Sequence, residues 1–240
     1  MSRYMLKEIR HLMGKAMHNQ NMTVQGDRII VSVSGGKDSM CLLWMLRERL
    51  KWLPINYRIT AVHVDPGFGT DSADRLRSFF EEQRFEYRII YGDFGTRAHS
   101  HENRENPCFL CSRLRRKAVF EAAEELDCNK IALGHHKDDM IETFFLNVFF
   151  GANISTMLPV QEFFNGKVTV IRPFYLTDEN ILKKFATHIK LPIIKSCCPS
   201  NRNTKREEIK LMLKSFYRSN KKIKGNIFHA MQNIKADYMP

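Results

Sequence analysis

The glycine-rich run 34–39 (SGGKDS) carries the groups that phosphate chemistry needs. It follows an apolar run typical of a buried parallel strand and precedes a helical pattern with leucines on one side. Backbone N–H groups at such a helix start favour an anion, and glycines let the backbone approach it closely. Ser34 and Ser39 add hydroxyl donors, Lys37 adds a positive charge, and Asp38 could hold magnesium. The run predicts a phosphate-binding loop, with an ordinary strand-to-helix turn as the alternative.

Cysteines at two places in the chain form a second candidate site. Cys108 and Cys111 form a Cys-x-x-Cys pair at the start of an expected helix, a spacing that suits zinc, an iron–sulfur cluster or a redox dithiol, with buried free thiols as the alternative. The helix N-terminus and the following arginines predict lowered thiol pKa values. The adjacent Cys197 and Cys198 supply a third ligand. Because the side chains of neighbouring residues diverge, only one of the two is expected to bind together with Cys108 and Cys111. Three thiolates fit a [4Fe–4S] cluster whose open iron can carry sulfur or a substrate.

A third candidate site follows another expected strand, in the stretch 133–143 (LGHHKDDMIET). It places Gly134 and His135, and then Asp138 and Asp139, where a strand ends and a helix begins. Either aspartate could hold magnesium or polarise a substrate; the alternative is a helix start with acidic first-turn residues, which the helix dipole favours. His63, near the end of an earlier strand, is a further candidate for nucleotide binding.

The elements that position these residues alternate between strand and helix. The sequence therefore predicts an α/β fold with a doubly wound, mostly parallel sheet and helices on both faces. Expected strands are 29–33, 57–65, 87–91, 130–134 and 168–171. Expected helices are 1–20, 38–50, 71–84, 109–126, 138–150 and 177–190, the last capped by Thr177, with a Thr-x-x-Glu capping box at Thr204 opening another. Residues 92–107 are expected to be irregular.

Length and composition indicate one α/β domain with small additions. The chain has 240 residues, of which 43% are hydrophobic. We expect an N-terminal helix over 1–26, the loop-bearing domain over 27–200 and a basic helical segment over 201–240. No apolar run is long enough for a membrane span, and the charged N-terminus lacks a secretory segment, so a cytoplasmic protein without disulfides is expected.

Positive charge is the strongest compositional bias. The formal net charge is +12, with excess basic residues in 113–117 and after residue 201. Such a surface suits a nucleic-acid backbone, with generic solubility as the alternative reading.

Separated blocks of the sequence together resemble a known family. SGGKDS after a strand resembles the PP-loop of the ATP pyrophosphatases, which cleave ATP between the α- and β-phosphates. With CFLCSRLRR, LGHHKDDMIETFFLN, VIRPF and PII-x-x-CC, the chain resembles the tRNA 2-thiocytidine synthetases over roughly residues 10–215. The resemblance implies an adenine nucleotide alpha hydrolase-like fold.

The resemblance also implies an activity and its cofactors. The enzyme would use ATP and Mg²⁺ to adenylate the C2 oxygen of a tRNA cytidine, at position 32 in the family, and replace it with sulfur through a [4Fe–4S] cluster. Residues 34–39 would bind ATP, with His63, Gly134 and His135 beside them. The catalytic residues would be Lys37, Asp38, Asp138 and Asp139. The cluster ligands would be Cys108, Cys111 and Cys198, with Cys197 as the alternative third.

The implied partners are tRNA and a sulfur donor, such as a cysteine desulfurase. A homodimer remains open beside a monomer, and no membrane is expected. Three other readings stay open: a lysidine-type tRNA ligase, which needs no cluster; a PP-loop sulfurtransferase for another nucleotide or a small molecule; and a non-catalytic nucleotide-binding RNA module.

Overall fold

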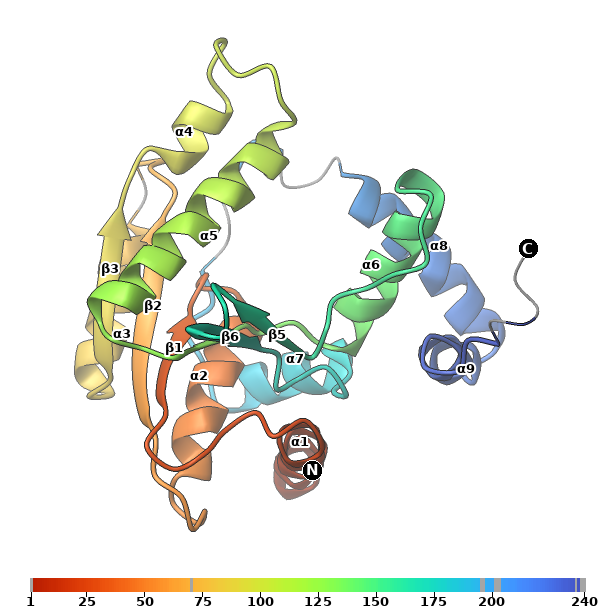
Figure 1. Ribbon diagram of the computed structural model, residues 1–240, viewed down its shortest axis with the longest axis horizontal. Helices are drawn as coiled ribbons and strands as arrows, with labels where there is room; N and C mark the ends of the chain where they lie inside the picture. The colour runs from red at the N-terminus through yellow and green to blue at the C-terminus, as the bar shows by residue number, and fades with distance from the viewer. Residues whose placement is uncertain (1, 70, 195–196, 201–203, 236, 238–240) are drawn as a thin grey trace. The chain divides into compact units, whose positions relative to one another are not determined.

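The computed structural model describes residues 2–69, 71–194, 197–200, 204–235 and 237 (Figure 1). The chain divides into two compact units. The first holds Met1–His136 and Leu158–Asn201, and the second holds Lys137–Met157 and Arg202–Pro240. Residues 137–157, which we expected inside the loop-bearing domain, therefore group with the C-terminal helices.

One mostly parallel sheet organises the first unit. Within the described residues it has six strands in the order β3-β2-β1-β4-β6-β5. The strands are β1 (Arg28–Ser32), β2 (Arg58–Asp65), β3 (Glu86–Tyr91), β4 (Lys130–Ala132), β5 (Val160–Phe163) and β6 (Val168–Ile171). Only the β5–β6 pair among them is antiparallel. The strand order reverses at β1, which pairs with β2 on one side and β4 on the other, so the crevice for a ligand is expected where β1 ends.

Helices cover both faces of this sheet. Those that pack on the strands are α2 (Lys37–Arg49), α3 (Ser72–Glu82) and α5 (Pro107–Glu125). Of the other helices of this unit, α1 (Ser2–Asn19) packs on α7 (Glu179–His188), α7 also packs on α2, and α4 (Phe94–Ala98) packs on α5. Figure 1 shows α5 in front of the strands, with α2 and α3 behind them. Small and branched residues of α5, among them Val119 and Ala123, pack on Ile30, Val62 and Ile131 of the sheet. The expected doubly wound architecture is thereby confirmed.

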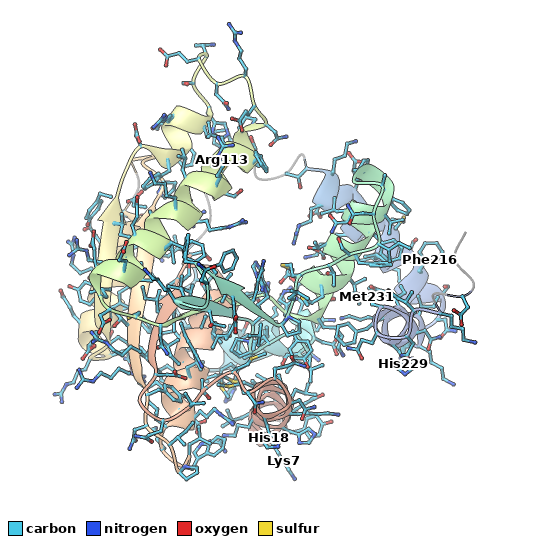
Figure 2. All side chains as sticks on the ribbon, viewed as in Figure 1. Lys7, His18, Arg113, Phe216, His229 and Met231 are labelled. Atoms are coloured by element: carbon cyan, nitrogen blue, oxygen red, sulfur yellow. The ribbon has the colours of Figure 1, made fainter. Side chains whose placement is uncertain are left out.

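The second unit is a small helical group. It contains α6 (Lys137–Phe150), α8 (Lys205–Ser219) and α9 (Ile223–Ala230). Ile141, Ile209 and Leu213 form its buried centre, and Met231 at the end of α9 packs against them (Figure 2). Thr204 begins α8 as expected, because its hydroxyl accepts a hydrogen bond of 3.3 Å from the backbone N–H of Glu207.

Three local expectations are wrong. Thr177 does not cap α7: its side chain is buried, its hydroxyl has no hydrogen-bond partner in the described structure, and Asp178 takes the cap position instead. The short helix α4 interrupts the stretch expected to be irregular. The edge strand β5 was not expected, because four residues pairing with β6 leave too little alternation to recognise.

None of the helices in the described part of the chain combines the length and apolar character that a membrane span requires.

Candidate active site

The loop 34–39 forms a compact turn between β1 and α2. The Ser39 hydroxyl accepts a hydrogen bond from the Ser34 N–H at 3.1 Å and donates to the Gly36 carbonyl at 3.0 Å. The hydroxyls of Ser34 and Ser39 are 3.2 Å apart. Gly36 is the cap residue of α2 and has no side chain to bond the first helical turn, while its own N–H donates to the Ser34 hydroxyl at 3.3 Å. The serines shape the loop, and its backbone donors remain suited to a phosphate.

Lys37 and Asp38 form an ion-pair network with a residue that the sequence did not single out. The Lys37 ammonium lies 2.9 Å from an Asp38 carboxylate oxygen and 2.9 Å from a Glu179 oxygen. Burial lowers the pKa of Lys37, but the charges and hydrogen bonds of Asp38 and Glu179 outweigh it, so the pKa is raised. Lys37 is therefore a fixed positive charge beside the loop. Glu179 is 142 residues away, and its place in the first turn of α7 offered a sufficient local reason for an acid.

Two glycines bring other segments into contact with the loop. Gly35 has φ +82°, a conformation that side chains rarely adopt, and its carbonyl accepts a hydrogen bond of 2.9 Å from the Ile194 N–H. A Cβ on Gly134 would lie 2.9 Å from the backbone of both Asp38 and Ser39. The end of β4 therefore packs directly on the first turn of α2, and only glycine fits there.

His63 lies behind the loop. It is buried, and its Nδ1 is 2.8 Å from the carbonyl of Val33, the residue that precedes the loop. Because a carbonyl only accepts, Nδ1 carries the proton, and Nε2 has no hydrogen-bond partner among the described residues. Burial lowers the pKa of His63, so the ring is neutral near pH 7. The Nδ1–H group of His63 therefore holds the end of β1 through the Val33 carbonyl, and Nε2 is a buried hydrogen-bond acceptor.

The two histidines that follow Gly134 contact different partners. His135 accepts a hydrogen bond of 3.1 Å from Nε of Arg172. His136, which is buried, has Nε2 3.8 Å from a carboxylate oxygen of Asp38. His136 thus reaches the loop network through Asp38, although the sequence favoured His135 for nucleotide binding.

Asp138 and Asp139 belong to the second unit, where basic residues surround them. Asp138 pairs with Lys224 at 2.6 Å, and Asp139 pairs with Arg206 at 3.2 Å. Glu142, one turn further along α6, lies 3.7 Å from Arg206. Burial raises the pKa of Glu142 to about 7. The expected catalytic role of the two aspartates stays a prediction.

The thiols gather at the start of α5. Asn106 caps this helix by accepting hydrogen bonds from the N–H groups of Cys108 and Phe109. Burial raises the pKa of the Cys111 thiol, Arg115 lowers it, and Cys198 and Cys108 raise it. The expectation of a lowered pKa is wrong for Cys111, because burial outweighs the arginine. Because Cys198 affects the pKa of Cys111, it lies close to the Cys108–Cys111 pair.

The surroundings of the late cysteines also differ. Cys198 is half-buried, with its sulfur 3.9 Å from Nε2 of His99, whereas Cys197 is exposed. The described residues contain no group of three His, Cys, Asp or Glu side chains arranged to hold a metal ion. A [4Fe–4S] cluster does not require its thiolates to converge on one ion, because each binds a different iron.

Comparisons with known proteins agree with this geometry. The family profile of the PP-loop domain matches residues 5–213. A tRNA-cytidine(32) 2-sulfurtransferase of Alkalilimnicola ehrlichii is 38% identical over 97% of this chain and 75% of its own length. One from Geotalea uraniireducens is 34% identical over 96% of this chain and 93% of its own. The chain belongs to the tRNA-cytidine(32) 2-sulfurtransferase family. The family and the enzyme class expected from the motifs, tRNA thiolation, are thereby confirmed.

Solved structures support the fold of this sulfurtransferase family member. The U34-tRNA thiolase NcsA from Methanococcus maripaludis, solved with its [4Fe–4S] cluster, matches with a TM-score of 0.80. It is 24% identical, and the match covers 96% of this chain and 78% of that one. The NH3-dependent NAD synthetase of Campylobacter jejuni matches with a TM-score of 0.52 at 13% identity, covering 100% and 97% of the two chains. The expected PP-loop fold is confirmed.

Sequence reasoning missed the parts of this site that come from distant positions. Glu179, His136, His99 and Ile194 contact the loop or the thiols. Glu179 and His99 lie in segments with no recognisable motif, whereas His136 and Ile194 lie inside the blocks LGHHKDDMIET and PII-x-x-CC, which the sequence had already singled out.

Proposed function

We propose that this chain is an ATP-dependent tRNA sulfurtransferase that converts cytidine 32 to 2-thiocytidine. The observation that carries the proposal is the loop 34–39, whose backbone donors and Lys37 form a phosphate site in a chain related to enzymes of that name. The thiols at the start of α5 supply the second half of the chemistry.

The reaction has two steps. The C2 oxygen of cytidine attacks the α-phosphorus of ATP, and pyrophosphate leaves. A sulfur nucleophile then adds at C2, and AMP departs with the original oxygen. Adenylation is needed because the unmodified oxygen is a poor leaving group, whereas AMP is a good one.

The residues of the loop suit the first step. Backbone N–H groups at the start of α2 and the Lys37 ammonium would bind the phosphates and stabilise the charge that develops on pyrophosphate. Asp38, a carboxylate within the loop itself, would hold a magnesium ion, which would neutralise phosphate charge. Asp138 and Asp139 are kept as further candidate magnesium ligands.

The thiols suit a bound cluster. Cys108 and Cys111 share the first turns of α5, and Cys198 is close enough to affect the Cys111 pKa. Cys108, Cys111 and Cys198 would hold a [4Fe–4S] cluster, which supplies an open iron at which sulfur can be carried. The half-buried Cys198 suits this role better than the exposed Cys197.

The test combines metal analysis with product analysis. Chain purified anaerobically should contain about four irons and four sulfides, and both should be lost in Cys108→Ala and Cys198→Ala but kept in Cys197→Ala. With ATP, a sulfide source and unmodified tRNA, it should release pyrophosphate and form 2-thiocytidine, detected by mass spectrometry of nucleosides. Pyrophosphate release with lysine attached to the base would instead identify a lysidine-type ligase. Binding of ATP and tRNA without pyrophosphate release would identify a non-catalytic module.

A further inference from the structure

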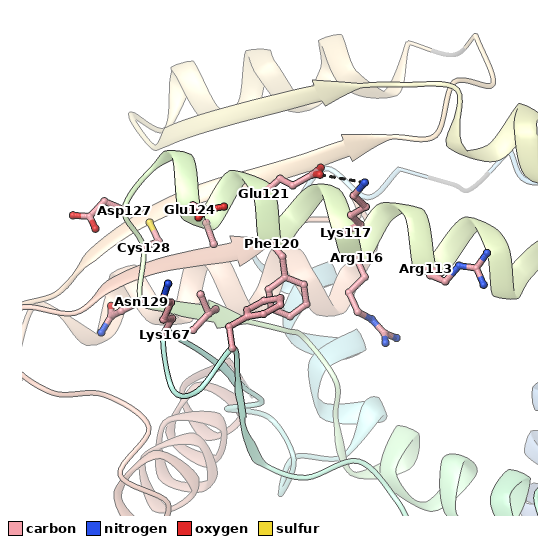
Figure 3. A pocket seen from close by; sticks show the side chains of 13 residues that line it. Arg113, Arg116, Lys117, Phe120, Glu121, Glu124, Asp127, Cys128, Asn129 and Lys167 are labelled. Carbon is pink, nitrogen blue, oxygen red and sulfur yellow. Dashed lines mark ion pairs between the residues drawn. The ribbon is translucent and has the colours of Figure 1, made fainter.

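A pocket of about 810 Å³ lies along α5, outside the site described above (Figure 3). Its walls are α5 and the turn between β5 and β6. One end reaches Asn129 and Val168, which lie where the parallel strands β4 and β6 begin. The loop 34–39 follows the opposite end of β1, so this end of the pocket lies at the other edge of the sheet.

Aromatic rings form the apolar part of the pocket. Phe120 of α5 contacts Phe164 edge-on, with ring centroids 5.3 Å apart. Phe164 is 60% exposed and has φ +54°, a left-handed conformation that is unusual for a bulky residue. The turn thus holds an aromatic ring in solvent against both its backbone preference and its hydrophobicity. The hairpin turn itself requires left-handed residues, as the neighbouring Asn165 and Gly166 show, so it is the exposure of the ring that points to a binding role.

Positive charge flanks these rings. Figure 3 shows Phe120 between Arg116 and Lys167, with Arg113 further toward the start of α5. The acids Glu121 and Asp127 in the wall are paired with Lys117 at 3.5 Å and Arg28 at 2.7 Å. In the part of the chain that the structure describes, neither Arg116 nor Lys167 has an ion pair.

The charge of the exposed Arg116 acts on a buried cation, Arg172. Burial, and to a smaller extent the charge of the nearby Arg116, together lower the pKa of Arg172 to about 10. Arg116 and Arg172 therefore bring two positive charges close together beside the pocket, whose lining also contains the acid Glu124. An anionic partner would relieve that repulsion.

We propose that the pocket is a tRNA-docking site, in which Phe164 stacks on an unpaired base and Arg116 and Lys167 bind the flanking phosphates. An aromatic platform between cations is the pattern by which proteins hold single-stranded nucleic acid. The inference rests on the proposed function and adds a contact away from the reacting cytidine. Cys111 and Phe120 are nine residues apart on α5, about 14 Å along its axis, so one RNA can reach both.

The experiment measures binding of an unmodified tRNA transcript to the full chain over a range of salt concentrations. Arg116→Ala/Lys167→Ala should weaken binding about tenfold or more and lower the slope of log Kd against log salt by about 1.5, because two phosphate contacts are lost. Phe164→Ala should weaken binding about 5- to 100-fold with little change in slope, and Phe164→Tyr should retain affinity.

Matched controls lie elsewhere on the first unit. Lys51→Ala/Lys184→Ala removes two exposed lysines, and Trp52→Ala removes an aromatic ring that is 47% exposed. Both controls should bind tRNA as the wild type does. Binding of ATP, measured separately, should be unchanged in every pocket variant, since none of these residues contacts the loop 34–39.

The outcomes separate the two proposals. If the wild type binds tRNA and the pocket variants weaken it no more than the controls, the docking inference is overturned and the proposed function stands. Unchanged tRNA affinity with weakened binding of a sulfur-donor protein would overturn it in favour of a protein-docking surface. A wild-type chain that binds no tRNA would overturn both.

Discussion

Two helices of this chain begin alike in sequence and differ in what surrounds their first turns. Helix α2 starts with Lys37-Asp38 and helix α6 with Lys137-Asp138, and each follows a strand and a glycine-containing turn. At α2 the cap is a glycine without a side-chain bond, and the lysine is held by Asp38 and Glu179. The result is a helix N-terminus with a fixed positive charge and a cap residue that has no side chain.

At α6 the charges are arranged the other way. Asp138, Asp139 and Glu142 lie in its first two turns, and Lys224, Arg206 and Lys210 from the same unit surround them. The acids interact favourably with the helix dipole, and the basic residues form ion pairs with the acids. The comparison shows that the same Lys-Asp pair after a strand can have opposite charged surroundings, so the proposal of a phosphate site at α2 rests on the glycine cap and the ion pairs of Lys37 and not on the pair alone.

The largest effect should come from removing the α2 lysine. Lys37→Met should lower pyrophosphate release about 100-fold or more, because the charge that stabilises the departing phosphate is lost. The matching variant at α6, Lys137→Met, should change the rate less than about threefold. A comparable loss in both variants, measured by pyrophosphate release on chain with unchanged thermal unfolding, would mean that the two helix starts share one function.

The acid cluster at α6 should make stability depend on pH. The folded pKa of Glu142 is about 7, above its ordinary value of 4.5, so the folded state binds a proton that the unfolded state has released. The stabilisation is therefore complete below pH 4.5 and is lost as pH rises to about 7, by about 3 kcal/mol at most.

The isosteric variant Glu142→Gln isolates this contribution. Urea unfolding at pH 5 and pH 8 should show that the difference in unfolding free energy between the two pH values is smaller in the variant. An identical pH dependence in both proteins would show that Glu142 ionises normally.

A glycine substitution tests how closely β4 must approach α2. Gly134→Ala places a Cβ 2.9 Å from the backbone of Asp38 and Ser39, and backbone cannot move aside as a side chain can. We expect a loss of about 1–3 kcal/mol in stability and a roughly tenfold weaker binding of ATP. Gly225→Ala is the control, since its Cβ would meet nothing within 4 Å; there helix propensity predicts unchanged or slightly higher stability. Equal effects of the two substitutions on ATP binding would contradict the close approach.

The smallest effect should come from a helix start whose donors are satisfied by a side chain. Thr204→Ala removes the bond to the Glu207 N–H and should cost about 1 kcal/mol, while Thr204→Ser should retain most of the stability. Thermal unfolding checks both. No loss in the alanine variant would show that solvent replaces the cap.

The sequence predicted the features that local pattern controls. The strand-turn-helix arrangement around residues 34–39 was predictable because strand, glycines and helix are contiguous, and the cap at Thr204 was predictable because the capping box has a fixed spacing. Features that depend on tertiary packing were not predictable. Glu179 reaches Lys37 only because α7 packs on α2, and Thr177 is buried instead of capping its helix.

The cysteines show the same limit of prediction from sequence within one site. The Cys108–Cys111 spacing places two thiols on one helix start, which the sequence could reveal. The raised pKa of Cys111 depends on how deeply this thiol is buried, which the spacing of the motif does not reveal. The motif therefore predicted the pair on the helix, and the packing determined the direction of the pKa shift of Cys111.

The position of β1 at the centre of the sheet has a consequence for synthesis on the ribosome. Its partner β2 begins 30 residues after it, but its other partner, β4, begins about 100 residues after it, at Lys130. At a synthesis rate of about 5–20 residues per second, that edge of β1 stays unpaired for roughly 5–20 s. During this interval the apolar residues of β1 lie at an open strand edge, so the nascent chain depends on chaperones or on α2 to keep that edge from pairing with another chain.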